Sequence, residues 1–174
     1  MTTLFAFGLA AGMCGRDDAR SAQAKPSAAP AAAEAQQQSV DVCSLLTNEE
    51  ITAVTGAKVA EIKAESHGAV GTCNYQAPNE LLPVVSLVLA PNMPRVSSSK
   101  QMAEWRSKQG GSFGDIKLII EPIEGLGVPA IRNQVEGVDL VTVEAAAKGK
   151  LLDVTTSSLE RSKALATKAL VRLR

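Results

Sequence analysis

A single histidine, His67, is available for acid–base chemistry near neutral pH in this chain of 174 residues. It follows Glu65 and Ser66 in the stretch ESHGAVG, so the residue types of a hydrolase triad stand side by side. A nucleophile needs its base within hydrogen-bond reach, and direct sequence neighbours seldom converge in that geometry. The stretch reads as a loop over residues 65–71, and we therefore interpret His67 as a solvated loop residue without a catalytic role.

Two pairs of carboxylates and one pair of glycines are the other places where chemistry is conceivable. Glycosidases use paired carboxylates, but Glu49 with Glu50 is more simply charge at a helix start, and Glu121 with Glu124 lies at a turn. The glycines of 125–127 lack the third glycine and the strand-to-helix context of a dinucleotide loop. The sequence thus predicts no catalytic, cofactor-binding or metal-binding residue.

An apolar stretch stands at the front of the sequence, where Leu4–Met13 are apolar or glycine. It is far shorter than the ~20 residues of a bilayer span, but it fits the core of a secretory signal, which runs for roughly 7 to 15 residues and ends in small side chains. The small residues 10–12 lead to Cys14. This arrangement resembles the lipobox of bacterial lipoproteins, in which the signal is removed and the cysteine thiol receives a diacylglycerol. We predict a signal peptide and lipobox over 1–14, with an ordinary export signal or a merely hydrophobic end as alternatives.

The following segment, 15–39, consists mainly of Ala, Gln, Ser and Pro and has almost no large apolar side chain. Such a chain cannot bury enough surface to offset its ordering entropy. Pro26 and Pro30 interrupt any helix, although 31–38 has the composition for a transient one. We predict a disordered tether that lets the folded domain, 40–174, stand clear of a membrane.

The composition of the chain limits the classes of partner that we expect the domain to bind. Lys plus Arg and Asp plus Glu both total 18, so the net charge is zero, and aromatic residues make up 3% of the chain. Nucleic-acid binding requires a concentrated basic face, and stacking of bases requires aromatic side chains. We therefore expect no nucleic-acid partner.

Helix-capping signals open the domain. Thr47 and Glu50 have the spacing of a capping box, and Leu46 and Ile51 that of a hydrophobic staple. Gly56 can take the left-handed conformation that ends a helix.

Periodicity then predicts the remaining elements. Met102 and Trp105 share a helix face, and Trp105 is more simply a core anchor than a ligand platform. Runs of short alternating segments indicate an α+β fold, with an antiparallel sheet of about six or seven strands and three helices packed mainly on one side. The segments are strands over 58–64, 71–76, 83–90, 115–123, 131–137, 140–147 and 150–157, and helices over 100–111 and 158–173.

If Cys14 carries a lipid, Cys43 and Cys73 remain as a pair. Exported domains meet an oxidising environment, so we predict a disulfide between them. Closing a loop of about 30 residues would stabilise the fold by roughly 3 to 4 kcal/mol in the chain-entropy model. Two thiols without a second pair or a histidine cluster make a poor metal site, which is the alternative.

The motifs CSLLTNEE, GTCNY and IEGLGVPA occur in that order, after the export signal and tether and before a leucine-rich last helix. Together they resemble a family of bacterial secreted lipoproteins of unknown function, whose pattern is C-x-L-L-T-x-x-E, a second cysteine followed by an aromatic residue, and G-L-G-x-x-A. The resemblance covers most of 41–173. It implies an α+β domain, a bridge between Cys43 and Cys73 and an envelope location, and it brings no catalytic residue.

We therefore expect a lipid-anchored protein at the periplasmic or extracellular side of the cell envelope that is not an enzyme. It would bind an envelope protein or a small apolar ligand through one face of its sheet, without a cofactor. The alternatives are an inhibitor or assembly accessory that pairs through an edge strand, and a cell-envelope hydrolase centred on His67.

Overall fold

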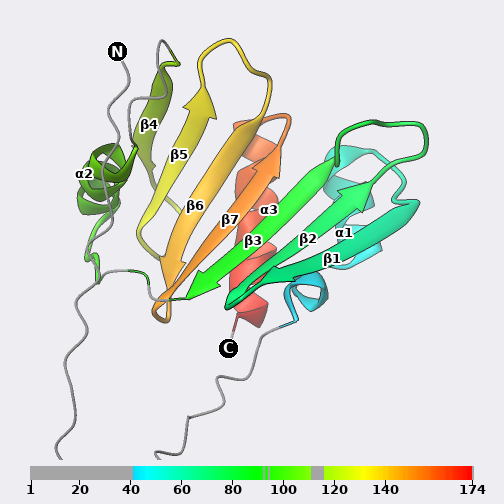
Figure 1. Cartoon of the computed structure of the whole chain (residues 1–174), viewed down its shortest axis with the longest axis horizontal. Helices are drawn as coiled ribbons and strands as arrows, with labels where there is room; N and C mark the ends of the chain where they lie inside the picture. Colours follow the sequence, from blue (N-terminus) through cyan, green and yellow to red (C-terminus); the bar gives the residue numbers. More distant parts are fainter. Residues whose placement is uncertain (1–40, 92, 94, 111–115, 174) are drawn as a thin grey trace, which may run out of the picture. The chain divides into compact units, whose positions relative to one another are not determined.

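The structure is a computed structural model that describes residues 41–91, 93, 95–110 and 116–173. The predicted signal peptide with Cys14 and the predicted tether lie outside these residues. The described part has an α+β fold, in which seven antiparallel strands form one sheet in the order β1-β2-β3-β7-β6-β5-β4 (Figure 1). Its elements are η1 (Val42–Leu45), α1 (Asn48–Thr55), β1 (Glu61–His67), β2 (Val70–Gln76), β3 (Val85–Pro91), α2 (Ser99–Gln109), β4 (Leu118–Ile123), β5 (Ala130–Val135), β6 (Val141–Ala147), β7 (Lys150–Thr156) and α3 (Leu159–Arg172).

The sheet consists of two meanders, β1–β3 and β4–β7, joined along their last strands. β3 and β7 pair from Ser86 with Thr155 to Pro91 with Lys150. The last strand of each meander therefore lies inside the sheet, and β1 and β4 form its two edges.

The start of the domain folds as its local signals predict. The Thr47 side chain accepts a hydrogen bond from the Glu50 backbone N–H, and the Glu50 carboxylate accepts one from the Thr47 N–H, which completes the capping box. Gly56 ends α1 with a φ of 76°, a conformation that costs glycine nothing and other residues about 1 kcal/mol or more.

One face of the sheet, which we call the helix-covered face, carries η1, α1 and α3. α3 packs against β6 and β7, and it lies behind the sheet in Figure 1. Leu152 and Val154 of β7 and Leu165 of α3 are fully buried in the cluster that fills the space between them. Burying side chains of this size is worth roughly 1.5 to 3 kcal/mol each, so this face holds the main core.

The opposite face, which we call the second face, receives α2 over β4 and β5. Met102 of α2 is fully buried against Ile131 of β5, and Trp105 packs partly buried on the same small cluster. Trp105 thus contributes to a core, as predicted. Of the three α-helices in the described part of the chain, α1 and α3 lie with η1 on one face, and α2 lies on the other.

The first hairpin differs from the prediction. The sequence predicts a strand over 58–64 and a loop over 65–71, but β1 begins at Glu61 and continues through His67, and β2 begins at Val70. Gly68 takes a φ of 63° in the short turn between them. The physical reason is pairing, because the polar residues 65–67 complete a ladder with β2 that their own side chains do not signal.

Candidate functional site

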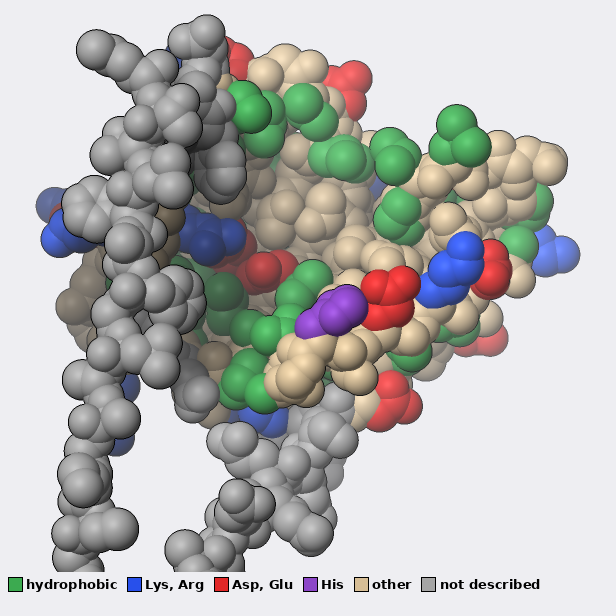
Figure 2. Space-filling model, in the orientation of Figure 1, with side chains coloured by type: hydrophobic (Ala, Val, Ile, Leu, Met, Phe, Trp, Pro, Cys, Tyr) green, Lys and Arg blue, Asp and Glu red, His purple; other side chains and the backbone are tan. Residues whose placement is uncertain are grey.

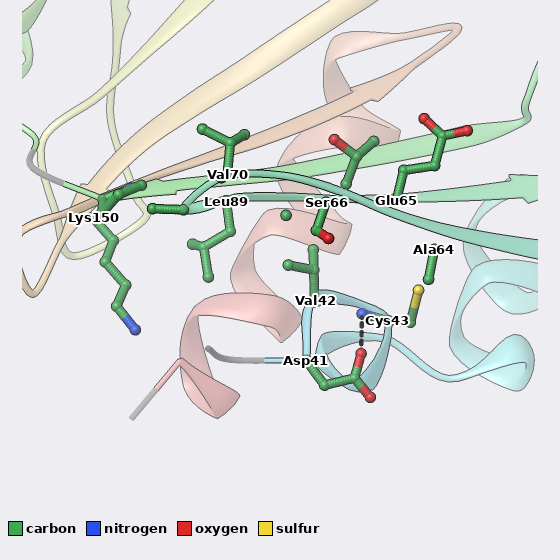
Figure 3. A pocket seen from close by; sticks show the side chains of 14 residues that line it. Asp41, Val42, Cys43, Ala64, Glu65, Ser66, Val70, Leu89 and Lys150 are labelled. Carbon is green, nitrogen blue, oxygen red and sulfur yellow. Dashed lines mark hydrogen bonds between the residues drawn. The ribbon is translucent and has the colours of Figure 1, made fainter. Parts of the chain in front are cut away.

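A groove of about 640 Å³ lies between η1 and the end of the β1–β2 hairpin, and we call it the η1 groove. In Figure 3, Val42 of η1, Leu89 of β3 and Ser66 of β1 project into it, whereas Glu65 points away. Val42 and Leu89 are each only 5% exposed, so they form an apolar floor. The Lys150 side chain lies at one end of the groove. The remaining lining residues include Ala64, Ala69, Val70, Gly71 and Pro91.

The position of η1, and therefore the width of the groove, is fixed by its links to β2. Cys43 and Cys73 lie at disulfide distance with their Cα atoms 5.2 Å apart. The fully buried Tyr75 donates its hydroxyl to the carbonyl oxygens of Cys43, at 3.0 Å, and Leu46, at 3.3 Å. Burial raises the pKa of Tyr75 to about 12, so the phenol remains a neutral donor.

A glycine in β2 lets η1 approach the sheet closely. A Cβ atom added at Gly71 would lie 2.5 Å from Cγ2 of Val42, which is too close for two carbon atoms. Any larger residue at position 71 would push η1 outward and change the groove.

The C-terminal helix holds η1 from the other side. Arg172 of α3 donates to the carbonyl oxygen of Leu45 at 3.0 Å and forms a bidentate pair with Glu50 at 2.7 and 2.9 Å. The hydrogen bonds from Arg172 to the Glu50 carboxylate are the largest cause of the lowering of the pKa of Glu50 to about 2. The groove therefore depends on contacts between the two ends of the described domain.

A second candidate site lies on the second face of the sheet, where two acidic residues stand directly opposite each other on β6 and β7. We call Glu144 and Asp153 the acid pair. Glu144 is fully buried, and its Oε1 accepts hydrogen bonds from Arg106 of α2 at 2.9 Å and from Asn133 of β5 at 2.6 Å. Its Oε2 is buried and has no hydrogen-bond partner among the described residues, and the same holds for Oδ1 of Asp153.

The electrostatics of the acid pair follow from this arrangement. Burial, and then the neighbouring Glu144 carboxylate, raise the pKa of Asp153 to about 7, against the opposing effect of Arg106. Two carboxyl groups share one guanidinium, so full ionisation of both would leave a negative charge in a poorly solvated place.

The structure brings together one pair of the residues considered in the sequence analysis and separates the others. Cys43 and Cys73 are brought together as predicted, whereas Cys14 lies outside the described residues. His67 is exposed at the end of β1, 3.8 Å from Glu65, and strand alternation points Ser66 to the opposite side. These three residues therefore form no triad.

In each of the two carboxylate pairs weighed above for glycosidase chemistry, one member has a structural partner. Glu50 belongs to the capping box and the Arg172 pair, and Glu121 forms a salt bridge with Arg132 at 3.1 Å. Gly125 and Gly127 have φ values of 88° and 72°, as expected of turn residues.

The acid pair was missed at the sequence level. Glu144 and Asp153 each look like the polar member of an ordinary alternating strand, in LVTVEAAA and KLLDVTTS. Their charge was the one available signal. Glu144 is the one charged residue of LVTVEAAA, and Asp153 is the one charged residue of LLDVTT. Only the pairing of β6 with β7 places them opposite each other.

No family model and no curated protein matches the chain. Within the described ranges, no three or more His, Cys, Asp or Glu side chains are grouped to hold a metal ion. Among the helices described, none combines the length and the apolar character required to span a bilayer.

Proposed function

We propose that this protein is a lipid-anchored component of the bacterial cell envelope that holds a small apolar ligand in the η1 groove and does not act as an enzyme. The groove itself is the observation that supports the proposal. Its volume of about 640 Å³ falls in the range typical of small-molecule sites, roughly 300 to 1,000 Å³. Val42, Leu89 and Pro91 give it an apolar surface.

The construction of the groove suits a binding module. A site that is preformed loses little conformational entropy when its ligand enters. The Cys43–Cys73 pair and the hydrogen bonds of Tyr75 and Arg172 hold η1 before any ligand arrives. The polar groups at the rim, Asp41 and Lys150, can orient a ligand that has one polar end.

Two neighbouring substitutions in β1 test the groove. Ser66→Trp would place an indole in the groove, whereas His67→Trp would place the same indole on the other side of the strand. The probe is N-phenyl-1-naphthylamine, a neutral apolar dye that becomes fluorescent in apolar surroundings. We expect Ser66→Trp to weaken dye binding roughly tenfold or more, which corresponds to about 1.4 kcal/mol, and His67→Trp to leave it unchanged. Equal effects of both variants, or no binding to the wild-type chain, would rule out the groove as the ligand site.

The anchor requires a separate test, because it concerns residues before the described domain. Cells that express the full chain are labelled with a clickable fatty acid, and the Cys14→Ala variant serves as the control. The proposal expects label on the wild-type chain only. If Cys14→Ala is labelled as strongly as the wild-type chain, the lipid is attached at another residue, and the proposed anchor site is wrong.

A second candidate function is pairing through the edge strand β1. All seven of its residues are exposed, and among the described strands it pairs only with β2. Alternating charges, including Glu61, Lys63 and Glu65, lie along one side of it, as is common where an edge must resist unwanted pairing. Hydrogen exchange with an envelope extract separates the two functions, because strand pairing would protect the amides of β1 and a groove ligand those around η1.

A further inference from the structure

The acid pair lies at the centre of the second face, away from the η1 groove. The residue row across the sheet runs from Val88 of β3 through Asp153 and Glu144 to Ile131 of β5. α2 contacts β4 and β5, and no described helix covers β3 or β7 on this side. Figure 2 shows this face hollowed over the middle strands, with an acidic and a basic patch adjoining there.

The acid pair lacks hydrogen-bond donors for two of its oxygen atoms among the described residues. Oε1 of Glu144 already accepts from Arg106 and Asn133, while Oε2 of Glu144 and Oδ1 of Asp153 accept from no described group. A buried acceptor without a donor costs roughly 1 to 3 kcal/mol, and more when it is charged. The structure thus presents two unsatisfied carboxylate oxygens, one from each of two adjacent strands.

A partner that satisfies both oxygens while both carboxyl groups are ionised must supply N–H or O–H donors and a positive charge. Arg106 is committed to Oε1 of Glu144, and two carboxyl groups against one guanidinium leave a net negative charge. Two carboxylates and an amide are too few protein ligands for a typical calcium site, which takes six to eight oxygens. We propose that Glu144 and Asp153 together bind the primary ammonium group of a small molecule, which inserts that group into the second face between the two side chains.

Neighbouring side chains fit the remainder of such a ligand. Val88, directly opposite Asp153, offers an apolar contact, and the hydroxyls of Thr142 and Thr155 lie 2.8 Å apart in the next row of the same face. An amine with a short polar or apolar body therefore finds contacts on both sides of the acid pair.

A proton competes with this ligand. One proton on Asp153, donated to Oε2 of Glu144, would satisfy both orphaned oxygens when no amine is present, in agreement with the raised pKa of Asp153. Binding of an ammonium ion then releases that proton to solvent. Among the described residues, α2 brings Arg106 to the acid pair, and its other charged side chains, Lys100, Glu104 and Lys108, are exposed. The distant strand β1 carries Glu61, Lys63, Glu65 and His67 on this face, and the facing positions of β3 and β5 are uncharged.

The test uses the full chain and methylammonium chloride, with tetramethylammonium chloride at equal concentration as the matched cation without N–H donors. Backbone amide shifts in NMR spectra report binding. We expect saturable shifts in β6 and β7 with methylammonium only. As the pH is raised, the affinity for methylammonium should increase by about tenfold per pH unit up to the pKa of Asp153 and should then level off.

Two variants locate the effect. Asp153→Asn keeps the shape of the side chain but removes one carboxylate, and should weaken methylammonium binding roughly tenfold or more. Asp139→Asn, at an exposed turn, is the control and should change nothing. Equal shifts with both cations, or equal loss in both variants, would overturn the site. So would a pH-dependent stability with no saturable shift, which would mean that the acid pair holds a proton only. The cation comparison needs no variant, so it decides the matter even if Asp153→Asn fails to fold.

Discussion

Two carboxyl groups on opposite faces of the sheet have pKa values that are shifted in opposite directions. On the helix-covered face, Glu50 caps α1 and is held by Arg172, which lowers its pKa to about 2. On the second face, Asp153 has no such partner among the described side chains, and burial, followed by the neighbouring Glu144 carboxylate, raises its pKa to about 7. The same kind of group thus stabilises the fold where its oxygens are paired and is left unsatisfied where they are not. Unsatisfied polar groups of this kind mark candidate functional sites.

The apolar cores of the two faces also differ, and the larger core lies on the helix-covered face. Beneath α1 and α3 lies the large cluster that includes Leu152, Val154 and Leu165, whereas the cluster beneath α2 is built around Met102 and Ile131. We infer that the helix-covered face carries most of the stability and that the second face is free to carry a ligand.

The largest predicted effect compares two adjacent leucines of β7. Leu152 is fully buried on the helix-covered face, and Leu151, 9% exposed, faces the other way. Leu152→Ala should lower the free energy of unfolding by about 3 to 5 kcal/mol, because a cavity remains in the main core, and Leu151→Ala by closer to 2 kcal/mol. Urea unfolding measures both, and a larger cost for Leu151→Ala would reverse our assignment of the main core.

The next effect concerns the Cys43–Cys73 pair. Replacing both residues by serine should cost about 3 kcal/mol, because the unfolded chain loses a constraint across a separation of 30 residues. The double variant should also lose dye binding in the η1 groove while keeping methylammonium binding on the second face. Chemical denaturation and the two binding assays can be run on the same preparation. If the double variant loses both dye binding and methylammonium binding, the two sites are not independent.

A smaller effect separates the faces by pH. Asp153 binds its proton more tightly in the folded state than in the unfolded one, so its contribution to stability is complete below about pH 3.8 and is lost as the pH rises to about 7. Asp153→Asn removes this loss. The variant should therefore gain on the wild type by on the order of 2 kcal/mol between pH 4 and pH 7. Unfolding curves over that range provide the check, and a constant difference would contradict it.

The smallest effect has the opposite sign with pH. The ionised Glu50 is favoured in the folded state, so its contribution is complete above about pH 4.5 and is lost as the pH falls toward about 2. Because Glu50 lies near the surface, Glu50→Gln should cost only about 1 kcal/mol at pH 7. Its cost should shrink in acid, as thermal unfolding at pH 7 and pH 3 would reveal. A cost that persists at pH 3 would assign the effect to packing.

The parts of the fold that the sequence predicts are those set by local chemistry. The capping box of Thr47 and Glu50, the glycine end of α1 at Gly56 and the alternation that buries Cys73 and Tyr75 on one side need only neighbouring residues. The α+β class and the pairing of the two cysteines follow from such signals and from the number of cysteines.

What the sequence could not predict depends on contacts between distant segments. Arg172 reaches Glu50 across 122 residues, and Arg106 reaches Glu144 only because α2 packs on the far side of the sheet. The polar end of β1 at Ser66 and His67 becomes a strand through its ladder with β2. The η1 groove and the acid pair both arise from these long-range placements, which is why sequence motifs did not indicate them.

The most direct test of the difference between the faces is an NMR titration of the side-chain carboxyl carbons in the folded full chain. The central claim is that pairing holds Glu50 ionised and that burial in the acid pair holds a proton on Asp153. We predict that Glu50 titrates near pH 2 and that the acid pair takes up a proton near pH 7. If both groups titrated together near their ordinary value of about 4, the two faces would not differ as described.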